Sequence, residues 1–155
     1  MHRVSFAKVV ILIFILIKSI TLQAHDGIIL SNAWISEAPP TVSILAGYLE
    51  IKNNTNETKI LNAVNSSDFN HIEIHQSIIR NGMASMEQQN ELSIAAGQTL
   101  KLTPGGYHLM LFDPSRPLRS GDTVPLEFSF ADGHKQTINA IVEKRNNSTH
   151  EHHHH

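Results

Sequence analysis

The sequence predicts an all-β fold, and three observations support that prediction. Short apolar stretches alternate with turn formers such as Asn81-Gly82, Pro104-Gly105-Gly106 and Asp132-Gly133. After residue 24, no window of about 11 residues keeps a helical period. The stretches are many, short and closely spaced, which is typical of an antiparallel sandwich or barrel. The length of 155 residues is that of one ordinary domain.

Ten stretches between the turns are candidate strands. They are Ile28–Ile35, Ala46–Lys52, Lys59–Val64, His71–Arg80, Met83–Gln89, Glu91–Ile94, Thr99–Leu102, Tyr107–Phe112, Val124–Phe130 and Lys135–Glu143. The residues after Lys144 are polar, and we expect them to form a disordered, His-rich tail over residues 145–155. The sandwich domain is therefore expected to occupy residues 25–144.

The first 24 residues have the layout of a secretory signal peptide. Arg3 and Lys8 precede the unbroken apolar run Val9–Ile17, and a polar step then leads to Ala24. We expect cleavage after Ala24 and a periplasmic protein, because the run is short for a membrane span of about 20 residues. Leu22 is large for its place near the cleavage point, so an uncleaved anchor is the alternative, and it would be the chain's one contact with the membrane.

Composition excludes several classes of function. The formal net charge is -2 and no segment carries a basic stripe, so nucleic acid is not an expected partner. Removing residues 1–24 takes away three basic residues and no acidic one, which leaves a mildly acidic domain. The chain has no cysteine, and this excludes disulfides, thiolate nucleophiles, iron–sulfur clusters and a blue-copper centre.

Methionine and histidine gather in one part of the chain. Beyond the initiator, the methionines are Met83, Met86 and Met110, and they lie beside His75 and His108. A single methionine commonly fills a gap in a hydrophobic core. Core filling does not explain why all three lie near histidines and none lies elsewhere. We therefore interpret the cluster as a candidate metal site.

A predicted hairpin selects between the first two methionines. Asn81-Gly82 between two strand-like stretches is a strong signal for a two-residue hairpin turn. That register places Ser77 opposite Met86, so Met86 shares a face with His75 and lies diagonal to it. Met83 falls on the opposite face. The hairpin therefore favours Met86 over Met83 as the partner of His75.

The second pair lies on a single predicted strand. His108 and Met110 are two residues apart, so their side chains point to the same face, whereas Leu109 and Leu111 point into the core. Two imidazoles and two thioethers form a soft, neutral ligand set, which selects Cu(I) over Zn(II), Mg(II) or Ca(II). The candidate metal ligands are His75, Met86, His108 and Met110.

At these residues the chain resembles the periplasmic PCuAC copper chaperone family. The motif of that family is a His, ten residues, a Met, twenty-one residues and then His-x-Met. Here His75 is followed by ten residues and Met86, and twenty-one more lead to His108-Leu109-Met110. One departure is Gln76, where many members have Met, but a side chain at this position points away from the face of His75.

Other parts of the chain are also similar to that family. They are Ala33-Trp34, Ala46-Gly47-Tyr48-Leu49 and the stretch from Leu102 to Met110, and the resemblance extends from about Ile28 to Glu143. It implies a cupredoxin-like antiparallel β-sandwich with Greek-key connections that binds one Cu(I) per domain. It also implies delivery of copper for cytochrome c oxidase assembly, with an oxidase subunit or an assembly factor as the acceptor.

Four classes of function are candidates for this chain. A copper chaperone with no chemistry of its own is favoured over an enzyme, because two His and two Met saturate Cu(I) and the motif positions no carboxylate beside it. Copper sequestration or resistance without delivery needs the same ligands, so it stays an alternative. A secreted β-sandwich binding module is the other, and it would make the clustering of His and Met accidental.

The other histidines lie outside the predicted copper site. His71 alternates with Glu73 and His75 on one strand face, and we interpret it as solvated; His134 follows a turn and is expected to be exposed. With cleavage after Ala24, His25 and the new amino terminus could chelate Cu(II). The run from His150 to His155 is either a purification tag or a native tail that binds a second copper.

Overall fold

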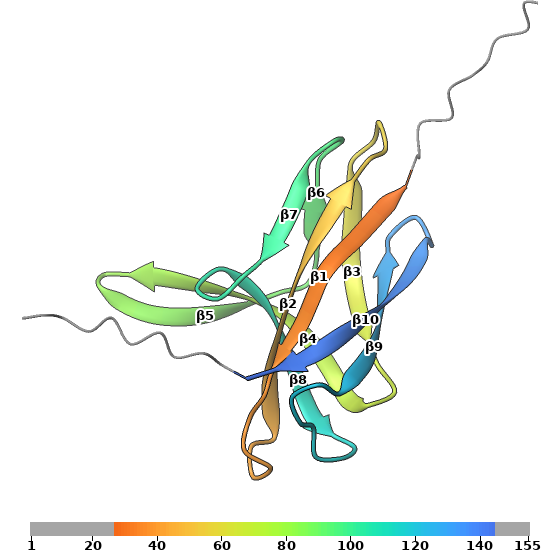
Figure 1. The fold of residues 1–155 in the computed structure, drawn as a ribbon. Coiled ribbons are helices and arrows are strands. Elements are labelled where there is room, and N and C mark those ends of the chain that lie inside the picture. Colours follow the sequence, from red (N-terminus) through yellow and green to blue (C-terminus); the bar gives the residue numbers. More distant parts are fainter. Residues whose placement is uncertain (1–26, 145–155) are drawn as a thin grey trace, which may run out of the picture.

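The computed structural model describes residues 27–144 and contains ten β-strands (Figure 1). They are β1 (Ile28–Ser36), β2 (Ile44–Asn53), β3 (Lys59–Asn65), β4 (Phe69–Arg80), β5 (Met83–Gln89), β6 (Leu92–Ile94), β7 (Thr99–Leu102), β8 (Tyr107–Pro114), β9 (Thr123–Phe130) and β10 (Lys135–Glu143). Every predicted strand is present, with its ends within two residues of the predicted ends. Within residues 27–144 no helix is long and apolar enough to cross a membrane. The signal segment expected over residues 1–24 and the tail 145–155 lie outside the described residues.

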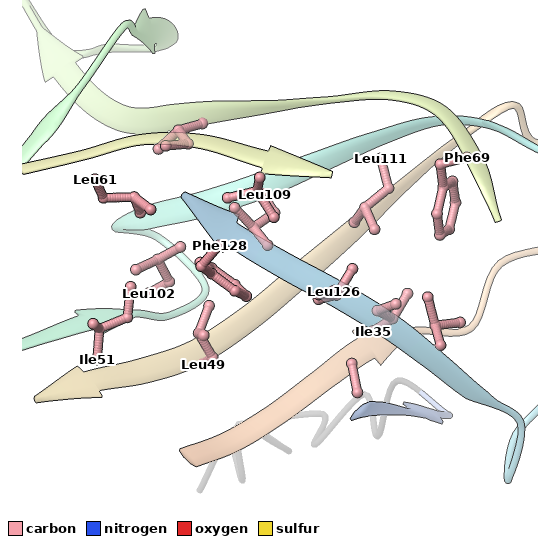
Figure 2. Close-up of a cluster of buried hydrophobic side chains, with 14 of the residues drawn as sticks. Ile35, Leu49, Ile51, Leu61, Phe69, Leu102, Leu109, Leu111, Leu126 and Phe128 are labelled. Atoms are coloured by element: carbon pink, nitrogen blue, oxygen red, sulfur yellow. The ribbon is translucent and has the colours of Figure 1, made fainter. Parts of the chain in front are cut away.

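The strands form one hydrogen-bonded sheet with the order β5-β4-β8-β7-β2-β1-β10-β9-β3-β6, and β8 also pairs with β2. Neighbouring strands are antiparallel, as the sequence predicts, except that β1 pairs with β10 and β7 with β8 in parallel. The sheet curls so that β9 crosses over β2 and β8 with apolar side chains between them (Figure 2). This arrangement is a cupredoxin-like β fold, which confirms the predicted fold class.

The core follows from the alternation of apolar and polar residues along the strands. On β9, Val124, Leu126, Phe128 and Phe130 are buried, and the residues between them face outward. Their partners on β8 and β2 include Leu109, Leu111, Leu49 and Ile51, all of which are buried (Figure 2). Full burial of one such side chain contributes about 1.5–3 kcal/mol. The predicted inward direction of Leu109 and Leu111 is therefore confirmed.

The β4–β5 hairpin forms in the predicted register. Asn81 and Gly82 have φ values of 54° and 76°, the positive values that a type I′ turn requires at both positions. Ser77 lies opposite Met86, as the hairpin argument expects. β8 pairs with β4 only as far as Gln76. Beyond Gln76, β4 and β5 pair only with each other, and this part of the hairpin extends away from the body of the sheet (Figure 1).

A tight turn leads into β8. The amide of Gly106 donates to the carbonyl of Thr103 at 3.0 Å, and Gly105 has a φ of 84°. Proline at the second position and glycine with positive φ at the third are the signature of a type II turn. Pro104 and Gly105 therefore fix where the chain enters β8, at Tyr107, one residue before His108.

The end of β2 is anchored by a buried asparagine. Asn53 is 0% exposed, and its Nδ2 donates to the carbonyls of Glu57 at 2.7 Å and Ile94 at 2.9 Å. Its Oδ1 accepts from the amide and the hydroxyl of Thr55 at 3.0 and 2.7 Å. The sequence marks this stretch only as a turn. The side chain in fact joins the β2–β3 loop to the end of β6.

Candidate metal site

The two predicted histidine ligands meet across a strand pair. His75 on β4 lies directly opposite His108 on β8. Their ring centroids are 6.1 Å apart and the rings are tilted by 32°. With metal–nitrogen bonds of about 2.0–2.1 Å, two imidazoles on one ion have centroids about 5–6 Å apart. The observed separation is thus close to what a shared metal ion requires.

The two predicted methionine ligands lie on the same face of the sheet, on the strands either side of β4. Met86 on β5 is opposite Ser77, and Ser77 is two residues from His75. Met110 on β8 is opposite Glu73 and two residues beyond His108. Because opposed residues and residues two apart share a face, β5, β4 and β8 bring all four candidate ligands to one side of the sheet.

A hollow of about 610 Å³ opens beside these strands. It is lined by Trp34, Ser36, Ala46, Tyr48, Ser77, Met86, Pro104, Gly105, His108, Glu143 and Lys144. Of the four candidate ligands, Met86 and His108 line it, whereas His75 and Met110 do not. Met86 is 61% exposed and His108 is 6% exposed, whereas His75 and Met110 are half-buried.

Hydrogen bonds hold both imidazole rings. Nε2 of His75 is 2.8 Å from Oε2 of Glu73, and Nδ1 of His108 is 3.1 Å from the carbonyl oxygen of Gly106. Nδ1 of His75 is buried and has no hydrogen-bond partner. The sequence interpretation gives Glu73 no role. The signal was the alternation of His71, Glu73 and His75, which places the carboxylate between two imidazoles on one strand face.

The other described histidines take little part in the site. His71 is half-exposed, stacks on Phe112 with ring centroids 4.2 Å apart, and keeps Nε2 3.7 Å from Oε1 of Glu73, too far for a hydrogen bond. His134 is exposed, as expected, and its backbone amide donates to Asp132 at 3.0 Å. His25 and the histidines of residues 150–155 lie outside the described part of the chain.

The donor set at this position is soft. Among the His, Asp and Glu side chains of residues 27–144, no group of three is arranged to hold a metal ion. Met86 and Met110 lie on the same face of the sheet as His75 and His108 and are the other candidate donors. Thioether sulfur combined with imidazole suits Cu(I).

The fold defines the class of the protein as a cupredoxin-like β domain with the architecture of PCuAC copper-binding domains. The copper-bound PCuAC domain from PmoF2 superposes with a TM-score of 0.64 at 20% identity, covering 76% of this chain and 92% of that domain. The solution structure of Cu(I)-DR1885 from Deinococcus radiodurans also gives 0.64, at 27% identity, covering 81% and 83% of the two chains.

The chain belongs to the LpqE-like family, described as putative lipoprotein LpqE-like, whose model matches residues 28–142. The putative lipoprotein Lxx21020 of Leifsonia xyli is 32% identical over 109 residues, which is 70% of this chain and 64% of that protein. The protein RP573 of Rickettsia prowazekii is 31% identical over 106 residues, 68% and 59% of the two chains. This chain thus spans less than two thirds of either relative.

Proposed function

We propose that this protein is an extracytoplasmic copper chaperone that holds one Cu(I) with His75, Met86, His108 and Met110 and delivers it to another protein. The observation that carries the proposal is the opposed pair His75 and His108, with Met86 and Met110 on the same face of β5 and β8, the strands on either side of β4. The spacing of the four residues resembles the PCuAC motif. Solved neighbours include a copper-bound and a Cu(I)-bound protein, which supports copper as the cargo.

The proposed location outside the cytoplasm has two supports. The first 24 residues read as a secretory signal peptide. The family and one relative are described as putative lipoproteins, which supports an extracytoplasmic protein. Copper supply to a cytochrome c oxidase site is the delivery route that the resemblance implies, with an oxidase subunit or assembly factor as acceptor.

A binding role is proposed rather than catalysis. Two imidazoles and two thioethers fill the four positions of a tetrahedral Cu(I) ion and leave no open position for a substrate. All four are neutral ligands, so an incoming thiolate of an acceptor can displace one thioether at a time. The exposed Met86 is the ligand that an acceptor reaches first.

The metal preference is the direct test of the site. A protein lacking residues 1–24 and 145–155 should bind one equivalent of Cu(I) tightly and Cu(II) or Zn(II) much more weakly, because thioether sulfur is a poor ligand for the harder ions. Competition against a chromophoric Cu(I) chelator under reducing conditions measures the affinity and stoichiometry. A protein that takes up Zn(II) or Cu(II) in preference would contradict the ligand assignment.

The docking surface for an acceptor is expected to be apolar. On the hairpin, Ile79 and Ala84 share the face of Ser77 and Met86, and Ile79 is 81% exposed. The charged pair of Arg80 with Glu87 lies on the other face of this hairpin. An acceptor would therefore meet the exposed apolar edge of the hairpin beside the proposed copper.

Transfer separates delivery from storage. Mixing Cu(I)-loaded protein with a reduced, copper-free dinuclear-copper domain should move copper to that domain, because its thiolates outcompete thioethers. Separation of the two proteins and metal analysis of each gives the distribution. The His75→Ala variant should not load specifically and so should deliver nothing beyond free copper. Copper that stays on the loaded protein at equilibrium would favour the sequestration alternative.

A further inference from the structure

We propose that Glu73 and the carbonyl of Gly106 lock His75 and His108 in opposite tautomers, so that the metal is bound through Nδ1 of His75 and Nε2 of His108. Glu73 thereby acts as a positioning residue for the site. This inference rests on the proposed function for its metal, but the tautomers are a property of the copper-free protein.

The two ring nitrogens of His75 have different surroundings. Nε2 lies 2.8 Å from Oε2 of Glu73, the distance of a charge-assisted hydrogen bond. An ionised carboxylate only accepts, so Nε2 must carry the proton. Nδ1 is buried and has no partner. A proton there would leave a buried donor unsatisfied, which costs about 1–3 kcal/mol. The tautomer with hydrogen on Nε2 therefore leaves a free lone pair on Nδ1.

His108 is held by the backbone. Its Nδ1 lies 3.1 Å from the carbonyl oxygen of Gly106, which can only accept, so Nδ1 carries the proton. The same oxygen accepts the backbone amide of Ser77 at 3.0 Å. This second bond ties Gly106 to β4, the strand that bears His75. The lone pair of His108 is thus left on Nε2.

The acceptors that fix the two tautomers differ in kind, but each leaves one ring nitrogen unprotonated. One is a side chain two residues before its histidine, and the other is the carbonyl that the Pro104-Gly105 turn presents. A metal-binding histidine commonly donates its other N–H to a carboxylate or a carbonyl, which fixes ring orientation and raises the basicity of the ligating nitrogen. The buried, unpartnered Nδ1 of His75 is therefore accounted for as a preformed metal-ligand atom.

The test is made first on the copper-free protein. In ¹⁵N-labelled protein, at a pH above the ordinary imidazole range, two-bond proton–nitrogen correlations distinguish protonated from unprotonated ring nitrogens. We expect protonated Nε2 and bare Nδ1 for His75, and the reverse for His108. In Glu73→Gln, whose amide can either donate or accept, His75 should become a mixture of tautomers while His108 is unchanged. Glu87→Gln, on the other face of the hairpin, is the matched control and should leave both rings as they are.

Copper binding gives the second readout. Cu(I) is diamagnetic, so loading should shift Nδ1 of His75 and Nε2 of His108 and leave the two protonated nitrogens in place. Glu73→Gln should weaken Cu(I) binding about 10- to 100-fold, the usual cost of losing an outer partner of a metal ligand, and Glu87→Gln should not. A proton on Nδ1 of His75 in the copper-free protein would overturn the inference even if copper binds. Correct tautomers without Cu(I) binding would instead overturn the proposed function.

Discussion

Met86→Leu and Met110→Leu are each expected to weaken Cu(I) binding by about 100-fold. Loss of a residue that only hydrogen-bonds to a metal ligand already costs about 10- to 100-fold, and here a proposed ligand itself is removed. Leucine keeps the apolar volume of methionine and removes only the sulfur, so the sandwich should fold as before. The loss would then report the thioether itself. Competition with a chromophoric chelator gives the affinity, and the denaturant midpoint checks that stability is unchanged.

Met83→Leu is the matched control for this pair. Met83 lies on the same strand and is exposed like Met86, but it pairs with Arg80 on the opposite face of the hairpin. Its substitution should leave the affinity for Cu(I) unchanged. Equal losses at Met83 and Met86 would mean that the face of the hairpin does not decide which sulfur binds, and the ligand assignment would have to be abandoned.

Asn53→Ala is expected to destabilise the fold by about 2–4 kcal/mol, a large share of the stability of an ordinary domain. The substitution removes the donors to the carbonyls of Glu57 and Ile94 and the acceptor for Thr55, at a site closed to water. Buried groups that lose their partners pay their desolvation cost in full. Urea unfolding should show a lower midpoint with an unchanged slope.

The control for this loss is Asn56→Ala, three residues further along the same loop. Asn56 is exposed, so its substitution should change stability by less than about 0.5 kcal/mol. Copper binding should be retained by folded Asn53→Ala protein, because the end of β2 is not part of the candidate site. A midpoint for Asn53→Ala equal to that of Asn56→Ala would show that the buried network contributes nothing net.

Much of the site's scaffold could be predicted because its signals are local. The Asn81-Gly82 turn fixed the hairpin register, and the two-residue spacing of His108 and Met110 fixed a shared face. The direct opposition of His75 and His108 could not be obtained this way, because the pairing of β4 with β8 joins distant segments. The parallel pairing of β1 with β10 is non-local for the same reason.

Two polar side chains were missed for another reason. The roles of Glu73 and Asn53 depend on which atoms are enclosed and which partners lie within hydrogen-bond distance. A sequence pattern shows that Glu73 shares a face with His75, but it does not show that Nδ1 of that ring is shut off from water. Burial is decided by the packing of many segments together, so it becomes visible only with the fold.

The protruding part of the β4–β5 hairpin separates one proposed ligand, Met86, from the strands that carry the others. His108 and Met110 lie on β8, which is hydrogen-bonded to strands on both sides. Met86 lies on β5, which pairs only with β4. Beyond Gln76 the β4–β5 ladder has no third strand beside it, so local opening of this part costs less than global unfolding. Fraying of the hairpin from its tip would lift one thioether off the copper while the other three ligands keep their places. A bound ion would thereby gain a vacant coordination position without any rearrangement of the sandwich.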